Sequence, residues 1–142
     1  MKVISQFALL ILVVALLFLA FTGNLFSSSP LVIAGQVLAV LLAVWARRSF
    51  PAQFSIQAAP AGGGIISSGP YHFIRHPMYA AALLLIWVSI AGHWSLLNAG
   101  IGVGVTAVIL IRIAAEETLL QASYPDYLAY AGQTKRLVPF LF

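Results

Sequence analysis

Four long apolar runs are the feature that most constrains how this chain can fold. They cover residues 3–21, 31–46, 77–94 and 96–115. A helix over residues 3–21 would reach roughly 28 Å, close to the thickness of the hydrocarbon core of a bilayer. Backbone polar groups that face lipid must be bonded within their own segment. We therefore expect an all-α fold, an integral-membrane bundle of about four transmembrane helices.

The composition agrees with a protein that has lipid as its main solvent. Hydrophobic residues make up 62% of the chain and charged residues 7%, against roughly 25% charged in a soluble domain. This excludes a cytosolic globular enzyme, a disordered tail and a coiled coil. The chain has no cysteine, so disulfides and thiolate sites are excluded, and no His/Asp/Glu spacing is typical of a metal site. The scattered basic residues do not favour nucleic acid as a partner.

The charged residues predict the orientation. With four spans, residues 1–2, the connection 47–76 and the tail 116–142 lie on one side of the membrane. That side receives Lys2, Arg47, Arg48, Arg75, Lys135 and Arg136. Such asymmetry predicts a multi-pass protein with both termini, the 47–76 loop and the tail in the cytoplasm, all within a single membrane domain, 1–142. In the tail we expect a short helix to Ser123 and a second helical turn from Pro125 to Tyr130.

One group of candidate functional residues opens the third apolar run. Pro77 suits the first turn of a helix, so the amides that follow it would form an anion site at the cytoplasmic interface. The alternative is that the basic side chains extend to lipid headgroups and the tyrosines form an interfacial belt. The polar and aromatic side chains of this group are Tyr71, Arg75, His76 and Tyr79.

A second group, Arg112 with Glu116 and Glu117, ends the fourth run. An Arg–Glu pair four residues apart on a helix is its structural explanation. Ionisable side chains beside the membrane are costly, however, and such groups are candidates for function.

Together the two groups resemble the isoprenylcysteine carboxyl methyltransferase and phospholipid methyltransferase superfamily. Its pattern is Gly-x-Tyr-x-x-x-Arg-His-Pro-x-Tyr at a helix start, then Arg-x-x-x-Glu-Glu, Tyr-x-x-Tyr and a basic-apolar-Pro ending. In this chain the pattern falls on 69–79, 112–117, 127–130 and 135–139.

The resemblance implies a cytoplasmic-face enzyme that binds S-adenosyl-L-methionine between the last two spans and methylates a small or lipophilic acceptor. It implies that Arg112 meets the substrate. By the same resemblance the cofactor contacts are Gln57, Gly63, Gly64, Ile65, Ile66, Tyr71, His76, Pro77, Met78, Tyr79 and Glu116.

The acceptor chemistry decides whether a base is needed. A carboxylate acceptor is already ionised at neutral pH and needs none, and we expect this type of acceptor, held by Arg112. A thiol or amine would need a base, for which His76 or Glu117 is the candidate. Two other functions stay open: an NADPH-dependent sterol-type reductase, and a non-enzymatic membrane subunit. Expected partners are the acceptor, membrane lipid and a second copy of the chain, because a homodimer would complete the lipid-facing wall.

Overall fold

The fold is described from a computed structural model, which covers residues 2–49 and 65–139, with side chains from Phe7 onward. Within these residues the structure is all-helical, with one isolated bridge between Ile74 and Lys135, and it confirms the expected fold class. The elements are α1 (Lys2–Phe21), α2 (Pro30–Arg48), a 3-10 turn η1 (Gly69–His72), α3 (Pro77–Gly92), α4 (Leu96–Ser123) and α5 (Tyr127–Gln133).

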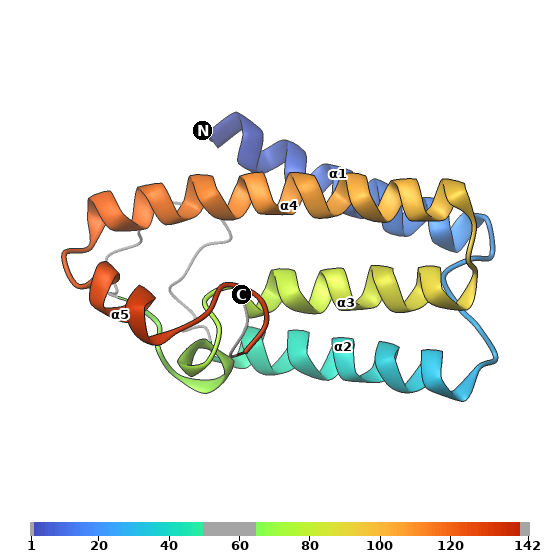
Figure 1. The fold of residues 1–142 in the computed structure, drawn as a ribbon, viewed down its shortest axis with the longest axis horizontal. Helices are drawn as coiled ribbons and strands as arrows, with labels where there is room; N and C mark the ends of the chain where they lie inside the picture. The colour runs from blue at the N-terminus through green and yellow to red at the C-terminus, as the bar shows by residue number, and fades with distance from the viewer. Residues whose placement is uncertain (1, 50–64, 140–142) are drawn as a thin grey trace.

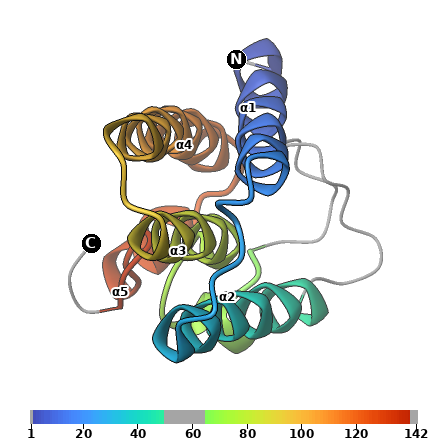
Figure 2. The same cartoon turned by 90° about the vertical axis from the view of Figure 1, so that its right-hand side faces the viewer.

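The four long helices lie side by side along the longest axis of the molecule (Figure 1). Helix α3 packs against both α2 and α4, and α1 packs against α4 (Figure 2). Isoleucine and valine side chains of α3 and α4 make the core between them, with Ala15 of α1 and Leu137 of the tail. Helices α3 and α4 are therefore neighbours. The second group of candidate residues lies on α4, and the first lies in the first turn of α3 and in the segment that leads into it.

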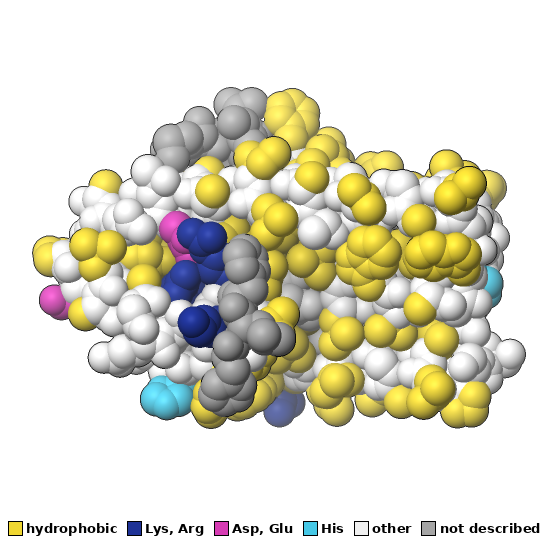
Figure 3. Space-filling view, viewed as in Figure 1, with side chains coloured by type: hydrophobic (Ala, Val, Ile, Leu, Met, Phe, Trp, Pro, Cys, Tyr) yellow, Lys and Arg dark blue, Asp and Glu magenta, His cyan; other side chains and the backbone are white. Residues whose placement is uncertain are grey.

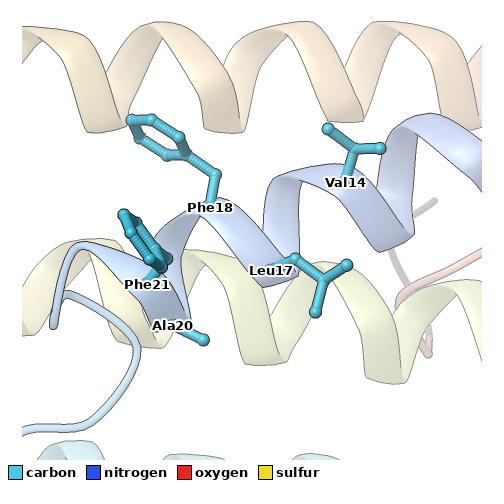
Figure 4. Close-up of a pocket in the computed structure, with 5 residues that line it drawn as sticks. All are labelled: Val14, Leu17, Phe18, Ala20 and Phe21. Atoms are coloured by element: carbon cyan, nitrogen blue, oxygen red, sulfur yellow. The ribbon is translucent and has the colours of Figure 1, made fainter.

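Two of the four predicted spans, α2 and α4, are long and apolar enough to cross a membrane. The apolar parts of the other two, Phe7–Phe21 in α1 and Pro77–Gly92 in α3, are shorter. Helix α1 presents large apolar side chains outward, and a shallow depression on its surface is lined by apolar residues (Figure 4). Its lining is Val14, Leu17, Phe18, Ala20 and Phe21. An apolar surface of this kind suits contact with lipid chains.

Local signals set the helix ends. Helix α1 ends at Phe21, two residues before Gly23, whose φ of +72° is a left-handed conformation that glycine adopts without strain. Pro30 and Pro77 occupy the first turns of α2 and α3, where a missing N–H costs nothing. Ser95 caps α4 by accepting a hydrogen bond of 3.0 Å from the amide of Asn98.

The C-terminal part of the fold differs in detail from the prediction. The fourth span and the expected short helix up to Ser123 form one continuous helix, α4, because no glycine or proline interrupts residues 105–123. The next helix, α5, covers Tyr127–Gln133, whereas the sequence predicted a turn over 125–130. The glutamates therefore lie in the interior of a helix that extends past the apolar run.

Candidate functional site

The antiparallel packing of α3 and α4 brings the two groups of candidate residues to one end of the bundle. Glu116 lies about 30 Å along α4 from Leu96, at 1.5 Å per residue. Because α3 runs in the opposite direction, its first residue, Pro77, lies at the same end as Glu116. The side chains of Tyr79 and His76 reach across to α4 from there.

Glu116 is the centre of a polar network between the two helices. The Tyr79 hydroxyl donates to Glu116 Oε1 at 2.6 Å. Arg112 Nε donates to the same oxygen at 3.1 Å and also to the Tyr79 hydroxyl. The arginine lies over the tyrosine ring, with its guanidinium carbon 5.5 Å from the centroid. The Arg112–Glu116 pair predicted from spacing is thus present, and α3 contributes a third member.

His76 is the second buried member of this end of the bundle. Its ring stacks on Tyr79 with centroids 5.7 Å apart, and Nδ1 lies 3.7 Å from Glu116 Oε2. His76 Nε2 is buried and has no hydrogen-bond partner among the described residues; the nearest carboxylate oxygen, Glu117 Oε1, is 3.5 Å away. A buried polar nitrogen without a partner is costly, so it is a position where a bound group can add a hydrogen bond.

Glu117 lies on a neighbouring face of α4 and is bound by two arginines. Arg75 Nε donates to Oε1 at 2.8 Å. On the other oxygen, Oε2, Arg136 Nε donates at 3.0 Å and Arg136 Nη2 lies at 2.9 Å. The glutamate is 5% exposed, so these are charge-assisted hydrogen bonds with little competition from water.

The tail pairs with the segment that leads into α3. The amides of Arg75 and His76 donate to the carbonyls of Lys135 and Arg136, at 2.7 and 3.0 Å. In return, the Lys135 amide donates to the Phe73 carbonyl at 3.1 Å. These three hydrogen bonds hold residues 135–136 directly beside the start of α3.

Two tyrosines complete the contact between the tail and η1. The Tyr130 hydroxyl of α5 donates to the Tyr71 carbonyl at 2.7 Å. Burial raises the pKa of Tyr130 to about 12, and burial together with Tyr130 and Glu116 raises the pKa of Tyr71. Both hydroxyls therefore remain protonated at neutral pH and act as neutral hydrogen-bonding groups.

The first turn of α3 offers backbone donors next to this network. Its first hydrogen bond runs from the Ala80 amide to the His76 carbonyl, at 3.0 Å. The amides of Met78 and Tyr79 precede that bond and have no partner within the helix. A helix start of this kind favours an anionic group.

The predicted cofactor residues fall into four sets. His76, Tyr79 and Glu116 are brought together with Arg112, as described above. Pro77 is buried beside them, whereas Met78 is 40% exposed. Tyr71 in η1, and Ile65 and Ile66 before it, lie on the approach to α3. Gln57, Gly63 and Gly64 lie outside the described residues.

The sequence did not predict the roles of Arg75 and Arg136 around Glu117. Both residues belong to the matched motifs, but their pairing joins positions 19 and 42 residues from Glu117. No helical or strand periodicity relates residues so far apart, so only the fold reveals these contacts.

Charged side chains gather at the end of the molecule that carries this network (Figure 3). The charged core of this network consists of three arginines and two glutamates: Arg75, Arg112, Arg136, Glu116 and Glu117. With His76 neutral, these five residues carry a net charge of +1. At the opposite end, the described connections 22–29 and 93–95 contain His93, the C-cap residue of α3, but no Asp, Glu, Lys or Arg.

A family model described as phospholipid methyltransferase matches residues 25–127 of the chain. This range includes α2, α3, α4 and the two groups of site residues. No curated protein and no solved structure matches the chain.

Proposed function

The chain belongs to the phospholipid methyltransferase family, and on that premise we propose that it transfers a methyl group from S-adenosyl-L-methionine to a lipophilic acceptor at the membrane surface. Membership makes the protein a membrane methyltransferase. It favours methyl transfer over the two other functions considered from the sequence, the sterol-type reductase and the non-enzymatic subunit.

One observation carries the proposal. The start of α3 and the far end of the apolar part of α4 meet in a single, partly buried network, in which Glu116 accepts from Tyr79 and Arg112 while His76 lies beside it. The two halves of the family pattern are far apart in the chain, since Tyr79 and Arg112 are 33 residues apart. Their convergence is what a site shared between two helices requires.

The described residues fit a ligand with the charges of S-adenosyl-L-methionine. Its carboxylate suits the amides of Met78 and Tyr79 at the start of α3. Its ammonium and sulfonium suit the Glu116 carboxylate and the aromatic face of a tyrosine. His76 Nε2, which makes no hydrogen bond within the described residues and lies 3.5 Å from Glu117 Oε1, can donate or accept one more hydrogen bond. When bound, the cofactor supplies a methyl group on a positively charged sulfur.

The protein's own contribution would be position and exclusion of water. Tyr79 is fixed from two sides, by its hydrogen bond to Glu116 and by the Arg112 side chain. The tail and η1 cover the start of α3. Holding two reacting atoms in line removes much of the entropy cost of a bimolecular step. No proton needs to leave the protein for this step if the acceptor is already ionised.

We propose a carboxylate as the reacting group of the acceptor. The net positive charge of the five-residue core favours an anion. A carboxylate also needs no general base, and both oxygens of Glu117 are bound to arginines. The family description supports a second candidate, the amine of a phospholipid headgroup, for which His76 would be the base.

The same arrangement supports the proposed orientation, with the site and both termini on the cytoplasmic side. S-Adenosyl-L-methionine is a polar cytoplasmic metabolite and would enter from that side. A lipophilic acceptor would reach the site laterally from the bilayer. A second copy of the chain would complete the lipid-facing wall.

A transfer assay tests the function. Purified protein in lipid nanodiscs is incubated with methyl-labelled S-adenosyl-L-methionine and either a prenylated cysteine or phosphatidylethanolamine. Label that enters the organic phase and is released by mild base is a methyl ester, whereas base-stable label is an N-methyl group. We expect base-labile label, and a loss of about 100-fold or more for His76→Ala.

Asp126→Asn is the control for that assay, because Asp126 is exposed in the turn before α5. Its activity should equal that of the unmodified protein. Base-stable label would instead identify the phospholipid amine as the acceptor. Absence of label with both acceptors would contradict the proposed function.

A further inference from the structure

Both carboxylate oxygens of Glu117 accept hydrogen bonds from arginine side chains. Its two oxygens are held by different arginines, Oε1 by Arg75 at 2.8 Å and Oε2 by Arg136 at 3.0 Å. The side chains of Glu117 and Arg75 are 7% and 11% exposed. A carboxylate that accepts charge-assisted hydrogen bonds on both oxygens is a poor proton acceptor. This argues against Glu117 as a general base.

Glu117 and its two arginine partners come from three separate parts of the chain. Glu117 belongs to α4, Arg75 to the segment before α3, and Arg136 to the tail after α5. Arg75 also donates through Nη1 to the carbonyls of Ala131 and Thr134. The one carboxylate and its two arginines thus join α4, the entry to α3 and the tail.

The backbone pairing of the tail depends on the same contact. The carbonyls of Lys135 and Arg136 accept from the amides of Arg75 and His76, and His76 is the N-cap residue directly before α3. The tail's own side chain in this contact, Arg136, is directed to Glu117. Three backbone hydrogen bonds on such a segment are individually weak. The side-chain anchor is the Glu117 carboxylate, which binds the largely buried Arg75 and the half-exposed Arg136 of the tail.

We propose that Glu117 is a positioning residue that fastens the C-terminal tail over the start of α3 and so completes the cofactor site. This inference rests on the proposed function in one respect, since it takes the start of α3 as the place where the cofactor binds. Removal of the carboxylate leaves the Arg75 guanidinium buried without its charge partner, which is strongly unfavourable. The segment around Arg75 and the tail would then separate.

Trypsin reports the position of the tail directly. The enzyme cuts after Lys135 and Arg136, and it requires a free, extended backbone. In the folded protein both residues are engaged in backbone hydrogen bonds to residues 73–76. Release of the segment from Leu137 to the C-terminus, followed by mass spectrometry, therefore measures how often the tail opens.

The test compares Glu117→Gln with Asp126→Asn, the same chemical change at an exposed acid of the tail. For Glu117→Gln we expect tail cleavage to be faster by about tenfold or more. We also expect the KM for S-adenosyl-L-methionine to rise by about the same factor, while the pH profile of kcat keeps its shape. Asp126→Asn should match the unmodified protein in all three measurements.

A base would behave differently. The proposal would be overturned if Glu117→Gln left cleavage and KM unchanged but greatly lowered kcat and removed the acidic limb of its pH profile. Glu117 would then be the base. If Glu117→Gln does not fold, Arg136→Gln replaces it, because that side chain is 43% exposed; cleavage after Lys135 is then the readout. Cleavage by trypsin does not depend on activity. If the unmodified protein is inactive, the proposed function is contradicted, and the cleavage rates still decide whether Glu117 anchors the tail.

Discussion

Glycines on the helices show how much single side chains matter at the interfaces of this protein. A Cβ atom at Gly35 on α2 would lie 2.8 and 2.9 Å from the two methyl groups of Val88 on α3. A Cβ atom at Gly104 on α4 would meet nothing within 4 Å. The first glycine permits α2 and α3 to approach closely, which is a common use of small residues between membrane helices.

These surroundings predict opposite effects for the same substitution. Gly35→Ala should lower the stability by about 1–3 kcal/mol, because Val88 is branched at Cβ and cannot turn both methyl groups away. Gly104→Ala should leave stability unchanged or raise it by up to about 1 kcal/mol through helix propensity. Thermal unfolding of both variants in the same detergent measures the difference. Equal midpoints would show that α2 and α3 do not pack as described.

At the same scale, part of the site could be predicted from the sequence. Pro77 marks a helix start and Arg112 with Glu116 marks one helix face, so both halves follow from local rules. The hydrogen bond from Tyr79 to Glu116 needs the antiparallel register of α3 and α4, for which the sequence has no local signal. The anchor formed by Arg136 on Glu117 is likewise a product of the tertiary fold.

The helices themselves follow closely from apolar runs, prolines and caps. Helices α2 and α3 begin at Pro30 and Pro77, at or within one residue of the predicted starts. The tail was harder to predict because α4 continues through two glutamates without a stop signal. Propensity alone does not say where such a helix leaves the membrane. The place of α5 depends on its contacts with η1, through Tyr130 and Tyr71.

The whole molecule is divided along its length into a charged end and an apolar remainder (Figure 3). The connections at the opposite end, 22–29 and 93–95, carry no Asp, Glu, Lys or Arg. This division underlies the proposed orientation, because basic segments are retained on the cytoplasmic side.

Labelling of single cysteines tests that orientation, and the chain offers a clean background because it contains no cysteine of its own. Ser28→Cys lies in the exposed connection before α2, and Asp126→Cys in the turn before α5. In intact cells a membrane-impermeant maleimide should label Ser28→Cys and spare Asp126→Cys until the cells are opened. The reverse pattern would show the opposite orientation. Labelling of both variants in intact cells would show that no membrane separates the two ends.

The central claim is that the ends of α3 and α4 together bind the methyl donor. Calorimetric titration of S-adenosylhomocysteine, the demethylated product, into the detergent-solubilised protein tests it most directly. We predict saturable one-site binding that Glu116→Gln weakens by about tenfold or more, since it loses a charge-assisted contact, and that Asp126→Asn leaves unchanged. No saturable heat with the unmodified protein, or equal affinity for Glu116→Gln, would contradict the account.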